Sequence, residues 1–310
     1  MKGQIFVLGA AGRLGFAAAG AFRDAGWSVK GLVRPGAAWR APKGIEILET
    51  IDRAVAVKEA RGTDIVLHAL SAPYIGWAQH ALPLAYSAIE AAEQSGATLM
   101  FPGNVYNYGA GMPPVLDEAT PMQPTSRKGK LRVEMEFRLQ EAADRGVRVI
   151  TLRAGDFFGR GRGSWFDLVL LKELAKNRIT YPGPLDVVHE WAYLPDYIQA
   201  LVRLAAIRAT LGPFESFGFS GHAITGQELI STIGKATGRH HLKVNYINWW
   251  MMPTVASIWK MGRELSEIGY LWQVPHRIDG GKLRAAIGEL PHTPLETAVT
   301  RSLRELDAIA

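Results

Sequence analysis

The chain has 310 residues, 48% of them hydrophobic, which is the size and composition of a globular protein with a full core. It contains no cysteine, which excludes disulfides, thiol nucleophiles and cysteine-bound metals and fits a cytoplasmic protein. The formal net charge is +6, but lysine and arginine are scattered and no apolar run reaches the length of a membrane span. We therefore expect neither nucleic acid nor a membrane as partner.

The first predicted elements carry the most specific motif. An apolar run at 5–8 predicts a buried strand, and an alanine-rich stretch at 16–25 predicts a helix. The residues between them form a G-x-x-G-x-x-G turn: Gly9, Ala10, Ala11, Gly12, Arg13, Leu14 and Gly15. Glycine permits the tight turn and a close approach to phosphate, and the helix N-terminus offers free N–H groups to an anion. The motif predicts a binding site for the pyrophosphate of a dinucleotide.

The first 150 residues continue the alternation of strand and helix, and the pattern then loosens. Further strands are predicted at 28–33, 45–48, 64–68, 98–101 and 148–152, with helices at 77–94 and 128–145. Beyond them we expect helices at 166–176, 195–208 and 295–309, a strand at 214–219, and a capping box from Thr225 to Glu228 that opens a helix through Thr237.

This order of elements predicts an α/β protein with a Rossmann-type, doubly wound parallel sheet. We expect residues 1–155 to form the NAD(P)-binding domain. Residues 156–310 would form mainly a smaller C-terminal substrate-binding lobe, with some segments returning to the sheet, and the Trp- and Met-rich stretch 249–272 would belong to that lobe. His240 and His241 have no third ligand nearby, so no metal site is expected.

The end of the second predicted strand favours NADP(H) over NAD(H). An acidic residue there binds the ribose hydroxyls of NAD, whereas a basic one accepts the 2′-phosphate of NADP. The strand ends at Arg34 without Asp or Glu, and Arg13 in the glycine turn is placed to reach the same phosphate. Two guanidinium groups pair well with a phosphate. The alternative is that Arg34 is a solvated surface residue, and NAD(H) remains the second choice.

The chain resembles the extended and atypical short-chain dehydrogenases/reductases, of the NAD-dependent epimerase/dehydratase kind, over nearly its whole length. The segments that carry the resemblance are the Gly9–Gly15 turn, residues 64–69, residues 104–109, residues 124–134, residues 153–159 and residues 191–197. The resemblance implies a nicotinamide cofactor, a small-molecule substrate and a homodimer through the helices at 77–94 and 128–145. It also implies that Ala69, Leu70 and Ser71, which follow the fourth strand, contact the cofactor.

The catalytic residues of that family are largely replaced. The family uses a Tyr-x-x-x-Lys pair with a Ser or Thr from the fifth strand. Here the tyrosine position holds Ser126 and the Ser/Thr position holds Pro102, so only Lys130 remains, to hold the nicotinamide ribose. A serine hydroxyl is a far weaker acid than a phenol, so Ser126 is no simple substitute. The alternative for Lys130 is an exposed helix lysine.

Three explanations stay open. The phenol of Tyr106 or Tyr108 acts instead; a carboxylate or imidazole acts, such as Asp156, His189 or Glu190; or the protein binds a dinucleotide without turnover and reports redox state to a partner. The candidate catalytic residues are Lys130, Tyr106, Ser126 and Asp156. We expect an NAD(P)-dependent oxidoreductase or epimerase/dehydratase-like enzyme, with a non-catalytic redox sensor as the alternative.

Overall fold

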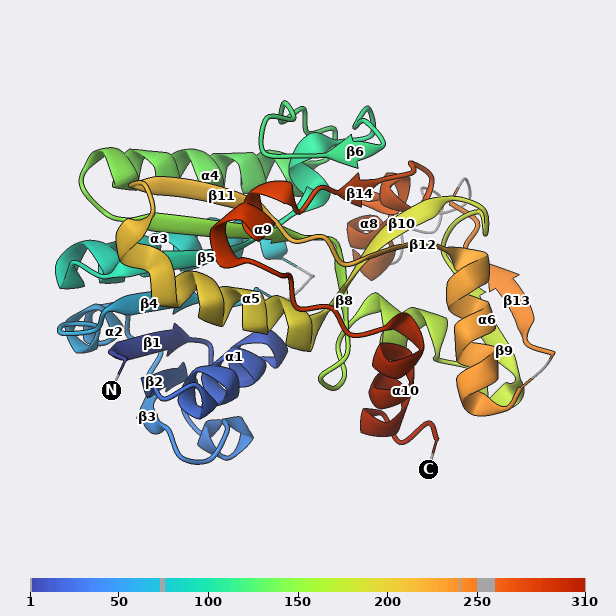
Figure 1. Cartoon of the computed structure of the whole chain (residues 1–310), viewed down its shortest axis with the longest axis horizontal. Helices are drawn as coiled ribbons and strands as arrows, with labels where there is room; N and C mark the ends of the chain where they lie inside the picture. Colours follow the sequence, from blue (N-terminus) through green and yellow to red (C-terminus); the bar gives the residue numbers. More distant parts are fainter. Residues whose placement is uncertain (1, 73–75, 240, 250–259, 310) are drawn as a thin grey trace.

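A parallel sheet forms the larger part of the molecule. The computed structural model describes residues 2–72, 76–239, 241–249 and 260–309. Within these residues, seven parallel strands hydrogen-bond in the order β11-β7-β5-β4-β1-β2-β3 (Figure 1). Their bounds are β1 (Gln4–Leu8), β2 (Ser28–Val33), β3 (Glu46–Glu49), β4 (Ile65–His68), β5 (Thr98–Asn104), β7 (Val149–Ala154) and β11 (Phe214–Gly218). Because the order reverses between β1 and β4, ligands are expected at the carboxyl edge beside these two strands. The predicted Rossmann-type sheet is confirmed.

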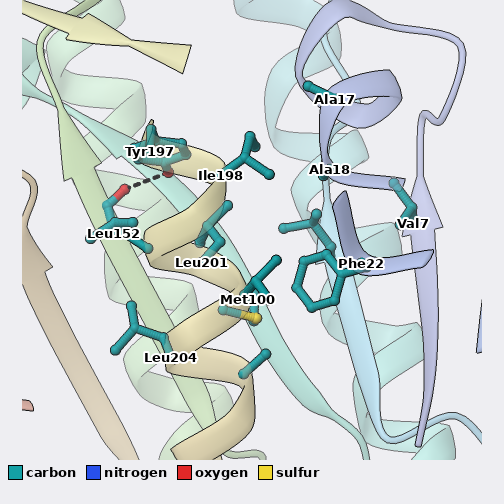
Figure 2. Close-up of a cluster of buried hydrophobic side chains, with 14 of the residues drawn as sticks. Val7, Ala17, Ala18, Phe22, Met100, Leu152, Tyr197, Ile198, Leu201 and Leu204 are labelled. Atoms are coloured by element: carbon teal, nitrogen blue, oxygen red, sulfur yellow. Dashed lines mark hydrogen bonds between the residues drawn. The ribbon is translucent and has the colours of Figure 1, made fainter. Parts of the chain in front are cut away.

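Helices cover both faces of the sheet. One face carries α1 (Arg13–Asp24), α5 (Leu194–Ile207) and α9 (Gly281–Ile287), and the other carries α2 (Arg53–Glu59), α3 (Trp77–Ser95) and α4 (Arg127–Asp144). Figure 2 shows the core under α1 and α5, where the Tyr197 hydroxyl donates to the Leu152 carbonyl at 2.9 Å. Both β11 and α5 come from the second half of the chain, so this half completes the layers around the sheet.

A smaller lobe follows the carboxyl edge of the sheet, at the right of Figure 1. In the described residues, its three-stranded sheet has the order β12 (His222–Thr225), β10 (Val188–Tyr193) and β8 (Asp156–Phe158). Two small sheets have two strands each: β13 (Lys243–Tyr246) with β9 (Arg178–Tyr181), and β14 (Arg277–Ile278) with β6 (Val115–Leu116). Its helices are α6 (Gly226–Thr237), α8 (Lys260–Ser266) and α10 (Leu295–Glu305). Tyr181, Trp191 and Trp272 are buried in its core.

Several predicted boundaries need correction. The helix predicted at 166–176 is wrong: a π-helical turn at Phe166–Leu170 and a 3-10 turn at Leu174–Lys176 replace it. This broken path buries Phe166, Leu170 and Leu174 together in the lobe core, which tertiary packing favours over a regular helix. The last helix ends at Glu305, four residues before its predicted end. The capping box between Thr225 and Glu228 is confirmed. In the described part of the chain, no helix is both long and apolar enough to cross a membrane.

Candidate functional site

The glycine turn has the close contacts that its sequence predicts. Gly9 has φ +98°, and a Cβ on it would lie 2.7 Å from the Ala69 carbonyl oxygen. A Cβ on Gly15 would lie 2.2 Å from the Gly9 carbonyl oxygen, so α1 packs directly on the turn. Both positions therefore need glycine. The turn is tied to β2 because the N–H groups of Gly9 and Ala10 both donate to the Leu32 carbonyl at 3.0 Å.

The opening helix begins earlier than predicted, at Arg13 rather than Phe16. Its N-cap residue is Gly12, which provides no side-chain cap, and its first turn has no acidic side chain. The free N–H groups and the positive end of the helix dipole are thus left to an anion. Ala69 and Leu70 lie directly against Gly9, and the exposed Ser71 follows them. Their contact with a cofactor stays a prediction.

A cavity of about 480 Å³ lies beside the turn, and we call it the arginine cavity. Its lining consists of Ala11, Gly12, Arg13, Phe16, Trp39, Arg40, Arg160, Gly161, Arg162 and Glu305. Four guanidinium groups thus meet one carboxylate at the helix N-terminus. Burial lowers the pKa of Arg13, against the charges of Asp167, Asp156 and Glu305. Its Nη2 atom is buried without a hydrogen-bond partner among the residues that the structure describes. Such a group is suited to an anionic ligand.

Sequence reasoning found only one of these four arginines. The predicted Arg34 is exposed and is not part of the cavity lining, which agrees with the surface alternative. Arg160 and Arg162 come from the loop after β8, where the backbone N–H of Arg160 donates to Glu305 at 2.7 Å and the Arg162 side chain donates to the Leu306 carbonyl at 3.2 Å. The end of α10 therefore holds this loop over the glycine turn. The Gly-Arg-Gly-Arg-Gly run at 159–163 was the available signal.

Helix α4 does not present the predicted pair to the sheet edge. The Ser126 hydroxyl caps the helix and accepts the Gly129 N–H at 3.0 Å. Lys130 is exposed, as its surface alternative required. Gly129 faces inward, and a Cβ there would lie 2.4 Å from the Tyr106 carbonyl oxygen. A contact of Lys130 with a cofactor stays a prediction that its exposed position does not favour.

Arg132 is the α4 residue that brings positive charge to the carboxyl edge. Its guanidinium donates to the Pro102 carbonyl in β5 at 3.4 Å and lies 5.4 Å from the Trp77 ring centre. Burial lowers its pKa, opposed most strongly by the charge of Tyr106. Sequence reasoning missed Arg132 because the family pattern directs attention to Lys130, two positions earlier. Strand β5 runs on to Asn104, so Pro102 lies inside the strand rather than at its end.

Asp156 and His189 form the clearest titratable pair at this edge. Asp156 stands two residues after β7, and its Oδ2 lies 3.0 Å from Nε2 of His189 on the neighbouring strand β10. The Asp156 side chain is 17% exposed, whereas that of His189 is 2% exposed. A partly exposed carboxyl group backed by a buried imidazole is suited to proton transfer.

The other proposed groups have structural partners. Glu190 is completely buried, and its carboxylate accepts the N–H groups of Gly221 at 2.7 Å and Ile278 at 3.0 Å, which joins three segments of the lobe. Burial raises the pKa of Glu190 to about 7. Tyr108 is buried too, and its hydroxyl donates to the Asp117 carbonyl at 3.4 Å. Neither is placed as well as Asp156 to meet a substrate.

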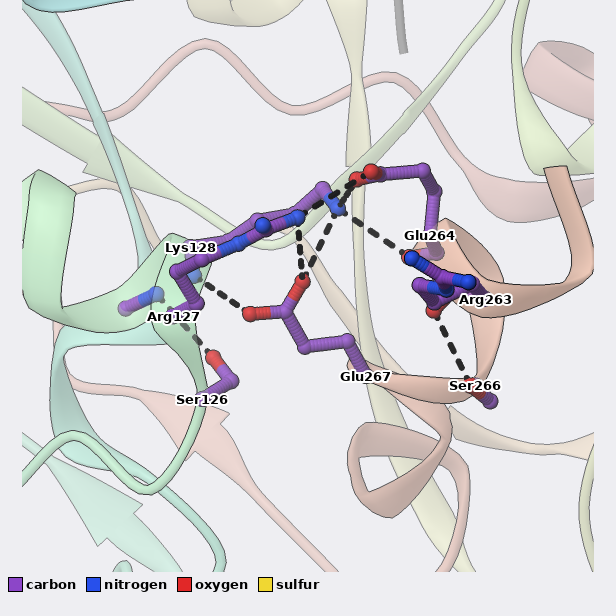
Figure 3. A network of polar contacts seen from close by, with 8 residues as sticks. Ser126, Arg127, Lys128, Arg263, Glu264, Ser266 and Glu267 are labelled. Carbon is purple, nitrogen blue, oxygen red and sulfur yellow. Dashed lines mark hydrogen bonds and ion pairs between the residues drawn. The ribbon is translucent and has the colours of Figure 1, made fainter. Parts of the chain in front are cut away.

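A buried ionic cluster ties the lobe to the sheet domain. Lys128 in α4 is 2% exposed and forms ion pairs with Glu264 in α8 and, at 3.1 Å, with Glu267 just after α8 (Figure 3). Arg127 donates to Glu264 at 3.1 Å from the more exposed side. The cluster fixes α8 against the start of α4, and so places the lobe over the carboxyl edge.

Comparison with known proteins agrees with this geometry. The family model of the NAD dependent epimerase/dehydratase family matches residues 5–216. The chain belongs to this family. None of the curated proteins matches the chain.

Solved structures share the fold over the full chain length. UDP-glucose 4-epimerase from Brucella ovis in complex with NAD superposes with a TM-score of 0.78, at 16% identity over 97% of each chain. UDP-N-acetylglucosamine 4-epimerase from Bacillus cereus superposes with a TM-score of 0.76 at 14% identity, over 99% of this chain and 100% of that chain. MoeE5 in complex with UDP-glucose and NAD superposes with a TM-score of 0.77 at 18% identity, over 98% of each chain. At identities this low, the structural similarity shows a shared fold and does not identify the substrate of this chain.

Proposed function

We propose that this family member is an NADP(H)-dependent oxidoreductase or epimerase-like enzyme that acts on a small molecule. The observation that carries the proposal is the arginine cavity beside the glycine turn. NADP differs from NAD by a 2′-phosphate, and four guanidinium groups around one cavity of about 480 Å³ favour that extra anion. No single arginine decides this, since the cavity gathers them from three separate segments.

The residues present fit such a cofactor. The turn from Gly9 to Gly15 and the free start of α1 would hold the pyrophosphate, because a side chain there would collide with backbone. Arg13, with a buried Nη2 that has no partner in the described part of the chain, supports a phosphate contact. When bound, the nicotinamide ring gives or takes a hydride. The protein would position it beside the carboxyl edge, near Asp156 and Arg132.

Calorimetry with NADPH and NADH tests the cofactor proposal. We expect the wild-type protein to bind NADPH more tightly than NADH. The Arg160→Ala/Arg162→Ala double variant should lose about 10²- to 10⁴-fold of its NADPH affinity with little change for NADH, since each of the two charge-assisted hydrogen bonds contributes about 1.5–3 kcal/mol. Arg34→Ala is the matched comparison, because Arg34 is exposed and outside the cavity lining. Equal NADPH and NADH affinities would overturn the preference.

The alternative is a non-catalytic redox sensor, and one observation favours it. Ser126 caps a helix and Lys130 is exposed, so the Tyr–Lys pair of the family has no counterpart at these two positions. A screen of carbonyl compounds with NADPH distinguishes the two, because a sensor binds the cofactor without oxidising it. A homodimer through α3 and α4 stays a prediction, which light scattering checks.

A further inference from the structure

We propose that Asp156 and His189 form a shared-proton pair that exchanges a proton with the substrate, in the role for which the family uses its tyrosine. The proposal rests on the proposed function, since it assigns the acid to the same cleft. Two features of the fold carry it: the place of Asp156 at the sheet edge, and the hydrogen bonds on both sides of the His189 ring.

The chain path brings the two residues together. Gly155 allows the segment after β7 to pass against β10, because a Cβ there would lie 2.0 Å from the Glu190 carbonyl oxygen. Asp156 then pairs in register with Trp191 and reaches the side chain of His189. Its other carboxyl oxygen, Oδ1, has no hydrogen-bond donor in the described part of the chain, and the side chain is partly exposed. Oδ1 is therefore the atom available to a substrate.

Hydrogen-bond counting gives the protonation state of the pair. Nδ1 of His189 lies 3.3 Å from the Leu271 carbonyl oxygen, which only accepts, so Nδ1 must carry a proton. Nε2 faces Oδ2 of Asp156 at 3.0 Å, and one further proton must lie between these two atoms. The pair therefore holds one proton more than a neutral imidazole beside a carboxylate. Loss of that proton leaves Nδ1 bare against the Leu271 carbonyl, or Nε2 bare against a carboxylate.

The surrounding residues that the structure describes hold the pair in place and add no acid that competes with it. The ring of His189 stacks on Trp272 at 4.1 Å with 2° between the planes, which holds its orientation and suits a cationic ring. The groups that face the pair electrostatically are Arg13, Tyr181 and His276. Burial and the charge of His189 lower the pKa of His276 to about 4, so it is neutral, and burial raises the pKa of Tyr181. Arg13 keeps its proton at all ordinary pH values.

The chemical step is balanced. A carbonyl carbon of the substrate would gain a hydride from NADPH, its C=O π electrons would move to oxygen, and that oxygen would take the one extra proton of the pair through the Asp156 carboxyl group. The products would be an alcohol, NADP⁺ and an Asp156 carboxylate beside a neutral His189 ring, whose single remaining N–H faces either Oδ2 of Asp156 or the Leu271 carbonyl. The reverse direction uses the carboxylate as the base. His189 acts as a positioning residue, because it contacts Asp156 and not the substrate.

Nitrogen NMR of the free protein tests the proton count without any substrate. The protein is labelled with ¹⁵N-histidine and measured at pH 7, and the His189 signals are assigned as those missing from the spectrum of His189→Gln. In the wild-type protein we expect the Nδ1 atom of His189 to carry a proton. In Asp156→Asn the amide can donate to Nε2, so His189 should become a neutral ring protonated on Nδ1 only. A wild-type His189 with a bare Nδ1 would overturn the proposal.

Turnover measurements test the catalytic role. With NADPH and a panel of aliphatic and aromatic aldehydes and ketones, Asp156→Asn should lose about 10²- to 10⁴-fold in kcat, keep its NADPH affinity by calorimetry, and lose the pH dependence of kcat. Asp186→Asn, an exposed carboxylate of the same lobe, is the control. Turnover by Asp156→Asn within threefold of wild type would reject the pair while leaving the cofactor proposal intact. Absence of NADPH binding by the wild-type protein would instead reject the proposed function.

Discussion

Glu190 gives the protein a pH-dependent stability that can be isolated by one substitution. The side chain is completely buried, and burial raises its pKa from 4.5 to about 7, partly offset by the N–H groups of Gly221 and Ile278. At pH values between these two pKa values, Glu190 keeps its proton in the folded protein, whereas in the unfolded chain it has released that proton. Stability from this group is therefore full below about pH 4.5 and falls as the pH rises towards 7. The size of the effect is about 3 kcal/mol.

Glu190→Gln removes this titration because an amide stays neutral. We expect the unfolding free energy of the wild-type protein to fall by about 3 kcal/mol more than that of the variant between pH 4.5 and 7. Gln can accept only one of the two N–H groups, so the variant also loses a constant amount of stability at every pH. Subtracting the two pH profiles separates the constant loss from the titration.

Urea unfolding followed by tryptophan fluorescence at several pH values measures the profiles. Glu296→Gln is the control, since Glu296 is exposed and its ion pair with Lys235 spans 3.5 Å at the surface. The control should run parallel to the wild-type profile. If Glu190→Gln runs parallel as well, the buried carboxyl group does not retain its proton in the fold, and the reasoning is refuted.

Three other substitutions, one of them with a matched control, test the contacts that hold the site. Gly15→Ala should lower the free energy of unfolding by about 1–3 kcal/mol and weaken NADPH binding, because its Cβ would lie 2.2 Å from the Gly9 carbonyl oxygen. Gly20→Ala is the control, since Gly20 has open space around it, and it should stabilise α1 by about 0.5–1 kcal/mol. Lys128→Met should lower the free energy of unfolding in urea by about 3 kcal/mol, since it removes the buried cation and leaves the nearly buried Glu264 and Glu267 with the more exposed Arg127 as their remaining cation among the described residues; a loss below 1 kcal/mol would contradict this. Tyr197→Phe should lower the free energy of unfolding by about 0.5–1.5 kcal/mol by removing a buried hydrogen bond to a β7 carbonyl, and an unchanged midpoint of thermal unfolding would argue otherwise.

The elements that depend on short stretches of chain could be predicted from sequence. Strand β2 has its predicted bounds, Ser28–Val33, because Val29, Leu32 and Val33 indicate a buried parallel strand even though Lys30 and Gly31 interrupt the apolar run. The glycine turn and the capping box at Thr225 were equally readable, since each needs particular residue types within a few positions. The family and the doubly wound class of the parallel sheet follow from these local patterns taken in sequence.

Tertiary structure alone decided which side chains surround the site. Arg160 and Arg162 reach the glycine turn only because α10, far along the chain, ties their loop in place. On α4 the rotation of the helix puts Arg132 towards β5 and Lys130 towards solvent, which motif spacing does not reveal. The pairing of Asp156 with His189 likewise depends on strands β8 and β10 lying side by side. Local patterns fix backbone conformation, whereas the charges that meet in a cleft are set by contacts between segments distant in sequence.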